Sequence, residues 1–91
     1  MDEYGIAAFR SRQQVMRFEE ALRREGLNVR VISTPRDVAI GCGLSVQFAV
    51  RDIRTVQNVL MRTRPANLIG LYLVEKGVGG RSRLTAISKQ G

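Results

Sequence analysis

The chain has 91 residues, of which 44% are hydrophobic and 25% are charged, so it is expected to fold as one domain with one modest core. Fifteen lysines and arginines oppose eight acidic residues, and the formal net charge of +7 favours an acidic partner, either nucleic acid or protein. The chain has no histidine and a single cysteine, which excludes histidine catalysis, an internal disulfide and a zinc cluster, so we expect no metal.

The first part of the chain predicts a strand followed by a helix. Tyr4 to Phe9 is a short apolar run typical of a strand. Ser11 is a suitable helix N-cap, and Gly26 stands where a helix C-cap is expected. Between them, Arg12 to Glu25 carries apolar residues at helical spacing. This stripe predicts the buried face of the helix: Val15, Phe18, Ala21 and Leu22.

The middle of the chain predicts two strands, a helix and a last strand. Leu27 to Ser33 reads as a strand that Pro35 ends, because proline removes a backbone donor. Leu44 to Val50 alternates apolar and polar side chains, which predicts a strand with one buried face. Arg51 to Arg64 has the spacing of an amphipathic helix, and Leu68 to Val74 is a fourth apolar strand. The predicted buried stripe of this helix is Ile53, Val56, Val59 and Leu60.

The element order β-α-β-β-α-β predicts an α+β fold of the ferredoxin-like, split βαβ type. Its antiparallel sheet would carry both helices on one face, and the other face would meet solvent or a second subunit. We expect residues 1–76 to form this single domain. Residues 77–91 are basic and contain glycines, so they are expected to form either a tail or an edge hairpin in which Leu84 to Ile87 pairs with the fourth strand.

The loop Thr34 to Gly43 is the strongest candidate for chemistry. Cys42 lies between Gly41 and Gly43, whose lack of side chains leaves the thiol open to another molecule, and Arg36 would favour the reactive thiolate. Such a thiol suits sulfur transfer through a persulfide. A structural interpretation is also open, with a buried cysteine and glycines in tight turns, and the spacing alone favours it.

A resemblance to a known family changes that balance. The run Ile32 to Arg36, followed by Cys42-Gly43 and a strand ending near Phe48, resembles the signature of a small bacterial family of selenium/sulfur carrier-like proteins over residues 4 to 75. The family pattern also matches at the residues Phe9, Ser11, Glu19 and Asp37, and the chain departs from it at Ala39 and Gly41.

The resemblance implies a carrier or binding protein rather than an enzyme, without a cofactor. Its partners would be a sulfur- or selenium-donating protein and an acceptor protein. In this hypothesis Cys42 holds the sulfur or selenium and Arg36 stabilises the thiolate. The remaining site residues set the start of the loop and leave the thiol accessible to a partner. Those residues are Thr34, Pro35, Gly41 and Gly43.

Two other classes of function remain open at this point. One is a regulatory or scaffold module that forms a homo-oligomer through its sheet and binds an acidic partner. The other is an RNA-binding module, which the scattered arginines permit but the scarcity of exposed aromatic residues disfavours, Tyr72 being the best candidate. The chain has no apolar run long enough for a signal peptide or membrane span, so we expect a cytoplasmic protein without membrane contact.

Overall fold

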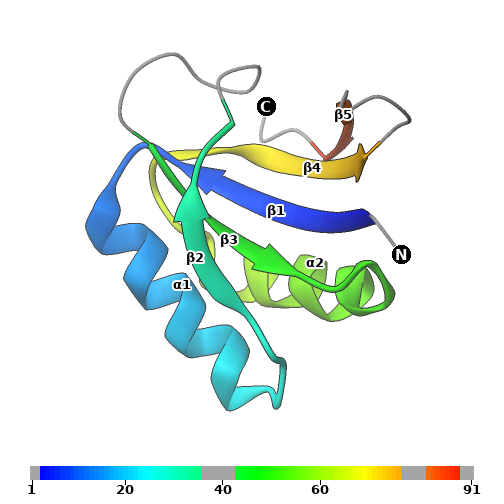
Figure 1. Ribbon diagram of the computed structural model, residues 1–91. Coiled ribbons are helices and arrows are strands. Elements are labelled where there is room, and N and C mark those ends of the chain that lie inside the picture. Colours follow the sequence, from blue (N-terminus) through cyan, green and yellow to red (C-terminus); the bar gives the residue numbers. More distant parts are fainter. Residues whose placement is uncertain (1–2, 36–42, 77–81, 89–91) are drawn as a thin grey trace.

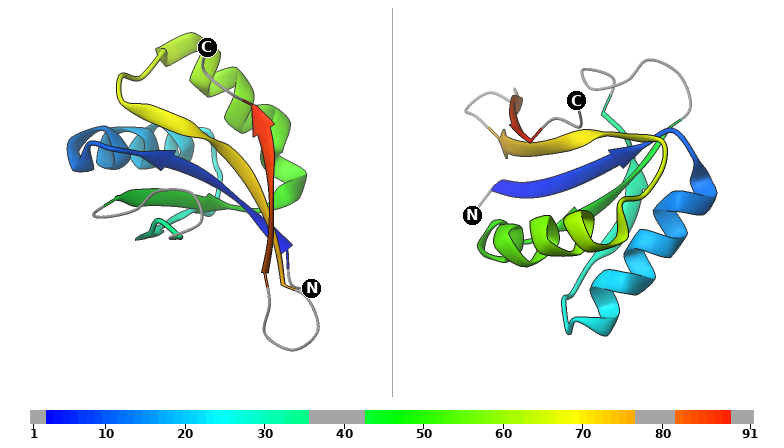
Figure 2. Two further views of the ribbon diagram at one scale, coloured as in Figure 1. Left: turned by 90° about the horizontal axis from the view of Figure 1, so that it is seen from above. Right: turned by 180° about the vertical axis from the view of Figure 1, so that it is seen from behind.

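The computed structural model shows an antiparallel sheet of five strands in the order β2-β3-β1-β4-β5, with two helices packed on one face (Figures 1 and 2). It describes residues 3–35, 43–76 and 82–88. The strands are β1 (Glu3–Phe9), β2 (Arg30–Ser33), β3 (Leu44–Phe48), β4 (Leu68–Lys76) and β5 (Ser82–Ser88). The helices are α1 (Arg12–Arg24) and α2 (Ile53–Thr63), with a short 3-10 helix, η1 (Val50–Asp52), before α2. The predicted α+β, ferredoxin-like arrangement is confirmed, and β5 adds an edge strand that pairs antiparallel with β4.

The ends of α1 follow from its flanking residues. The Gln14 amide donates a hydrogen bond of 3.4 Å to the Ser11 hydroxyl, so Ser11 is the N-cap that the sequence predicts. After the helix ends, Gly26 takes a left-handed φ of 85°. The Leu27 amide then bonds back to the Leu22 carbonyl, which keeps Leu27 in the helix terminus. The strand β2 begins at Arg30, three residues later than the sequence predicts.

The second helix is shorter than predicted at both ends. Its first turn is the 3-10 helix η1, and α2 proper begins at Ile53. Arg64 caps its end in the left-handed conformation, because Pro65 disfavours the α conformation of the residue before it.

The main core lies between the helices and the sheet. The rings of Phe9 from β1 and Phe18 from α1 pack in a tilted arrangement with centroids 5.4 Å apart, and Phe48 of β3 is 1% exposed. Gly5 pairs with Phe48 across β1 and β3, and any side chain at Gly5 would overlap the Phe48 ring. The predicted helix stripes are confirmed at the fully or almost fully buried positions Val15, Leu22, Val56 and Val59.

The centre of the other sheet face is also buried, which corrects the expectation of a face open to solvent or a second subunit. Side chains alternate between faces along a strand, so Ile6, Ala8 and Ser45, the cross-strand partner of Ala8, lie opposite the core residues Ala7 and Phe9. Ile6, Ala8 and Ser45 are fully buried. In the described parts of the chain, no helix has the length and apolar character needed to span a membrane.

Candidate functional site

The site predicted from the sequence belongs to the connection between β2 and β3. The structure describes its two ends, with Thr34 and Pro35 on the β2 side and Gly43 on the β3 side. Arg36, Gly41 and Cys42 lie outside the described residues. The described residues of the connection form the loop base, from which it leaves the sheet and to which it returns.

The two ends of the loop are joined by main-chain hydrogen bonding. Ser33 and Leu44 are the last cross-strand pair of β2 and β3. One residue further, the Thr34 amide donates to the Gly43 carbonyl at 3.0 Å. The strand pairing thus continues past both strands, and residues 35–42 leave and return at neighbouring points.

A buried pair of hydroxyl groups anchors this base to the sheet. The hydroxyl oxygens of Thr34 and Ser45 are 2.7 Å apart, Thr34 is 9% exposed and Ser45 is fully buried. Each hydroxyl gives the other a hydrogen-bond partner, so neither is left unpaired in the interior. The apolar/polar alternation of 44–50 placed Ser45 on the less buried face, and nothing in that pattern indicates its bond to Thr34.

Gly43 is required by close approach. A Cβ atom at Gly43 would lie 3.2 Å from the Thr34 hydroxyl oxygen and 3.6 Å from the carbonyl oxygen of Phe9. The glycine therefore lets the end of the loop pack directly against Thr34 and the end of β1. The sequence predicts Gly43 as a site residue for access to the thiol, and the structure shows this second reason for it.

Arg10 is a neighbour of the loop base that the sequence analysis missed. Phe9 pairs with both Leu44 and Leu68, so Arg10 follows in the same register beside Gly43. The Arg10 amide donates a hydrogen bond of 2.9 Å to the Asn67 carbonyl, which fixes the Arg10 backbone to the turn before β4. Its side chain is exposed and forms no ion pair with any residue that the structure describes. The only available signal was its position between the first strand and the Ser11 cap.

The amino end of α1 lies at the same end of the sheet. The helix begins at Arg12, two residues after Arg10, and Figure 1 shows its first turn beside the end of β1 and the start of β3. Unpaired amides at a helix start carry partial positive charge. Within ranges 3–35, 43–76 and 82–88, no three histidine, cysteine, aspartate or glutamate side chains are placed to hold a metal ion. The exposed Arg10 side chain and the amino end of α1 both place positive charge near the loop base, which favours an anion there.

Comparison with known proteins gave one match. Residues 4–68 match the family described as "Putative Se/S carrier protein-like". The matched span includes β1 from Tyr4 onward, both helices, the loop base and Cys42. No curated protein and no solved structure matched the chain.

Proposed function

The chain belongs to the Se/S carrier protein-like family, and from this premise we propose that Cys42 carries sulfur or selenium between a donor protein and an acceptor protein. The geometry of the loop base supports the proposal most directly. Cys42 directly precedes Gly43, and adjacent Cα atoms in a chain are about 3.8 Å apart. The thiol would thus be held one residue from Gly43, whose carbonyl accepts a hydrogen bond from the Thr34 amide.

The closed base also supports a role for Arg36. Arg36 follows Thr34 by two residues and Cys42 precedes Gly43 by one, while Thr34 and Gly43 are hydrogen-bonded to each other. The two loop arms therefore start side by side, although six positions separate the residues in the sequence. We expect the Arg36 guanidinium, with Arg10 and the amino end of α1, to favour the Cys42 thiolate. Pro35 would restrict the first step of the loop.

The proposed reaction is an exchange at sulfur. The Cys42 thiolate attacks the outer sulfur of a persulfide on the donor, a new sulfur–sulfur bond forms, and the donor leaves as a thiolate. An acceptor thiolate then attacks the outer sulfur of the Cys42 persulfide and releases the Cys42 thiolate. Each step replaces one sulfur–sulfur bond by another, so no external oxidant or reductant is needed. A selenium atom in the outer position would follow the same sequence, and the reducing cytoplasm would keep the free thiol available.

The test is loading of the protein by a cysteine desulfurase supplied with cysteine, followed by mass spectrometry of the intact chain. The wild type is expected to gain about 32 Da, one sulfur atom, and the gain should disappear after reduction. Cys42→Ser should gain nothing. Arg10→Gln and Arg36→Gln should each slow loading by about threefold to tenfold, because each weakens the field that favours the thiolate.

Arg24→Gln is the matched control, since it removes the same charge from an exposed site on α1 that pairs with Glu20. Its loading rate should stay close to that of the wild type. A wild-type chain that gains no sulfur, or a Cys42→Ser variant that gains sulfur equally well, would contradict the proposal.

A further inference from the structure

We propose that a hollow at the end of the sheet remote from the loop base binds a carboxylate group. The hollow has a volume of about 330 Å³ and lies where β2 begins and β3 ends. Four polar side chains line it, from Tyr4, Asn28, Arg30 and Gln47. The site is separate from the loop base, and the inference does not depend on the sulfur chemistry proposed above.

The strand register brings these side chains together. Arg30 pairs with Gln47 across β2 and β3, and Gln47 pairs with Ile6 across β3 and β1. Antiparallel partners point to the same side of a sheet, and Tyr4 lies two residues before Ile6, so Tyr4, Arg30 and Gln47 share the face opposite the helices. Gln47 and Gly43 are four residues apart on the β3 path, roughly 13 Å, so the hollow and the loop base lie at opposite ends of β3.

The charge of the lining favours one negative group. Arg30 is the only charged residue that lines the described hollow, and no carboxylate opposes it there. Its side chain forms no ion pair with the residues in the described ranges, whereas Arg23, Arg24 and Arg62 are all paired. A guanidinium binds a carboxylate through two parallel hydrogen bonds, and the Tyr4 hydroxyl and the Asn28 and Gln47 amides supply further donors. One cation matches the single charge of a carboxylate better than the double charge of a phosphate.

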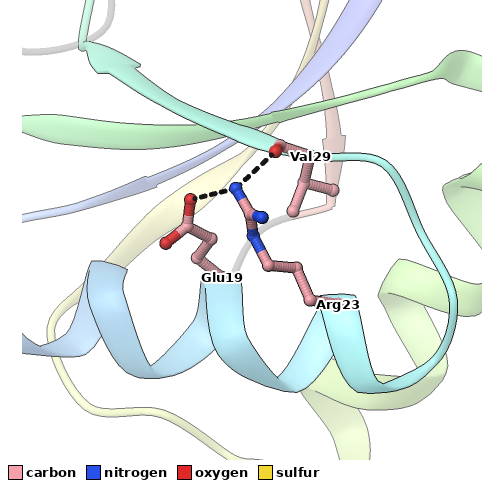
Figure 3. Close-up of polar contacts among 3 residues, drawn as sticks. All are labelled: Glu19, Arg23 and Val29. Atoms are coloured by element: carbon pink, nitrogen blue, oxygen red, sulfur yellow. Dashed lines mark hydrogen bonds and ion pairs between the residues drawn. The ribbon is translucent and has the colours of Figure 1, made fainter.

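Arg23, which does not line the hollow, holds the lining residue Val29 in place. The Arg23 guanidinium donates at 3.2 Å to the Val29 carbonyl and at 3.1 Å to the Glu19 carboxylate, as Figure 3 shows. This bond takes up an acceptor oxygen next to Arg30, and it fixes the start of β2 against α1. Arg30 and Asn28 therefore extend from a chain segment whose position is set before any ligand arrives. The volume exceeds that of a carboxylate alone, so the ligand has a body as well as a charged end.

A carboxylate of this kind could come from a small acid or from an acidic side chain of a partner protein, and two pairs of probes distinguish them. The first pair is N-acetylleucine and its uncharged amide. The second is a pentapeptide with blocked ends and a central glutamate, and the same peptide with glutamine. Each probe is titrated into isotope-labelled full-length protein, and the amide resonances of Tyr4, Arg30 and Gln47 are followed by NMR.

At least one carboxylate probe is expected to shift these resonances to saturation. Its uncharged counterpart should bind at least about tenfold more weakly. Arg30→Gln should weaken binding about tenfold. Arg54→Gln, the same charge change at an exposed site on α2, should alter it by less than about twofold. Binding of the leucine derivative indicates a small acid, and binding of the glutamate peptide alone indicates a partner protein.

Three results would overturn the proposal: no saturable shift with either carboxylate, equal binding of charged and uncharged probes, or unchanged binding by Arg30→Gln. The dispersion of the remaining amide resonances reports whether Arg30→Gln is folded. Tyr4→Phe provides a second variant that removes only a hydroxyl, and it should weaken binding by about twofold to tenfold.

Discussion

At the scale of single residues, the Thr34 hydroxyl is the group that links the loop base to the interior of the sheet. It contacts the Ser45 hydroxyl at 2.7 Å and would lie only 3.2 Å from a Cβ atom at Gly43, so the side chains at these three positions depend on one another. Buried hydroxyls of this kind are stabilising only while both partners are present, because an unpaired one costs about 1–3 kcal/mol.

Gly43→Ala is expected to lower the free energy of unfolding by about 1–3 kcal/mol, because the added methyl group crowds the Thr34 hydroxyl. Urea unfolding measures the change. Thr34→Ala removes the crowded hydroxyl and leaves Ser45 unpaired, so by itself it should also destabilise the protein. The double variant should lose less unfolding free energy than the sum of the losses in the two single variants. Strict additivity would show that the methyl group and the hydroxyl do not compete for the same space.

The residues of the candidate site differ in how far the sequence could predict them. Cys42 is conspicuous because it is the only cysteine and stands between glycines. Ser45 and Arg10 are not conspicuous, because their roles arise from cross-strand register, which a local pattern does not contain. The alternation of β3 assigned Ser45 to a less buried face, and burial of the second sheet face overrode that expectation.

At the scale of elements, the pairing of β1 with β3 depends on a glycine opposite an aromatic ring. Phe48 fills the space that a side chain at Gly5 would occupy, and it is almost completely buried. Phe48 belongs to the core cluster that packs under the helices, so the ring has little room to move away.

Gly5→Ala should therefore destabilise the protein by about 3 kcal/mol or more, a larger effect than that of Gly43→Ala. Thermal and urea unfolding give the comparison. Ala8→Gly, three pairs along the same strand, adds no atoms and controls for altered strand propensity. If Phe48→Leu is introduced with Gly5→Ala, part of the loss should be recovered, since the smaller side chain leaves space. A Gly5→Ala protein as stable as the wild type would contradict the predicted overlap.

The elements themselves were largely predictable from periodicity. The Ser11 cap, the buried stripes of both helices and four of the five strands follow from local sequence, and their order predicts the sheet. Some differences have local physical causes, such as the hydrogen bond from the Leu27 amide to the Leu22 carbonyl, which keeps Leu27 at the helix end and out of β2. The strand β5 was one of two open alternatives, because its sequence is short, half-exposed and weakly apolar, and pairing with β4 decides its conformation.

At the scale of the whole molecule, positive charge is unevenly neutralised. The three ion pairs found in the described regions all involve α1 glutamates or its C-cap, namely Glu19, Glu20 and Glu25. These pairs are exposed and contribute little to stability. Because the paired glutamates all lie on α1 or at its C-cap, most of the net positive charge of +7 lies on other parts of the chain. Such a surface should speed the encounter with an acidic donor protein.

Sulfur loading by the desulfurase should consequently slow by about tenfold between about 0.01 and 0.15 M salt, as the Debye length falls from about 30 to 8 Å. The rate is measured at low donor concentration, where encounter limits it. Alkylation of Cys42 by neutral iodoacetamide is the control and should change little over the same range. Loading that is indifferent to salt would show that the net charge has no part in recognising the donor.

The hydrogen bond from Thr34 to Gly43 has a consequence for how this protein can vary. A segment whose ends are already held together adds little entropy cost when it lengthens, only about 0.6 kcal/mol for each doubling. Insertions or exchanged sequences between Pro35 and Cys42 would thus leave the register of the sheet intact. Because the loop base is closed by this hydrogen bond, the same fold can carry loops of different length and chemistry between β2 and β3.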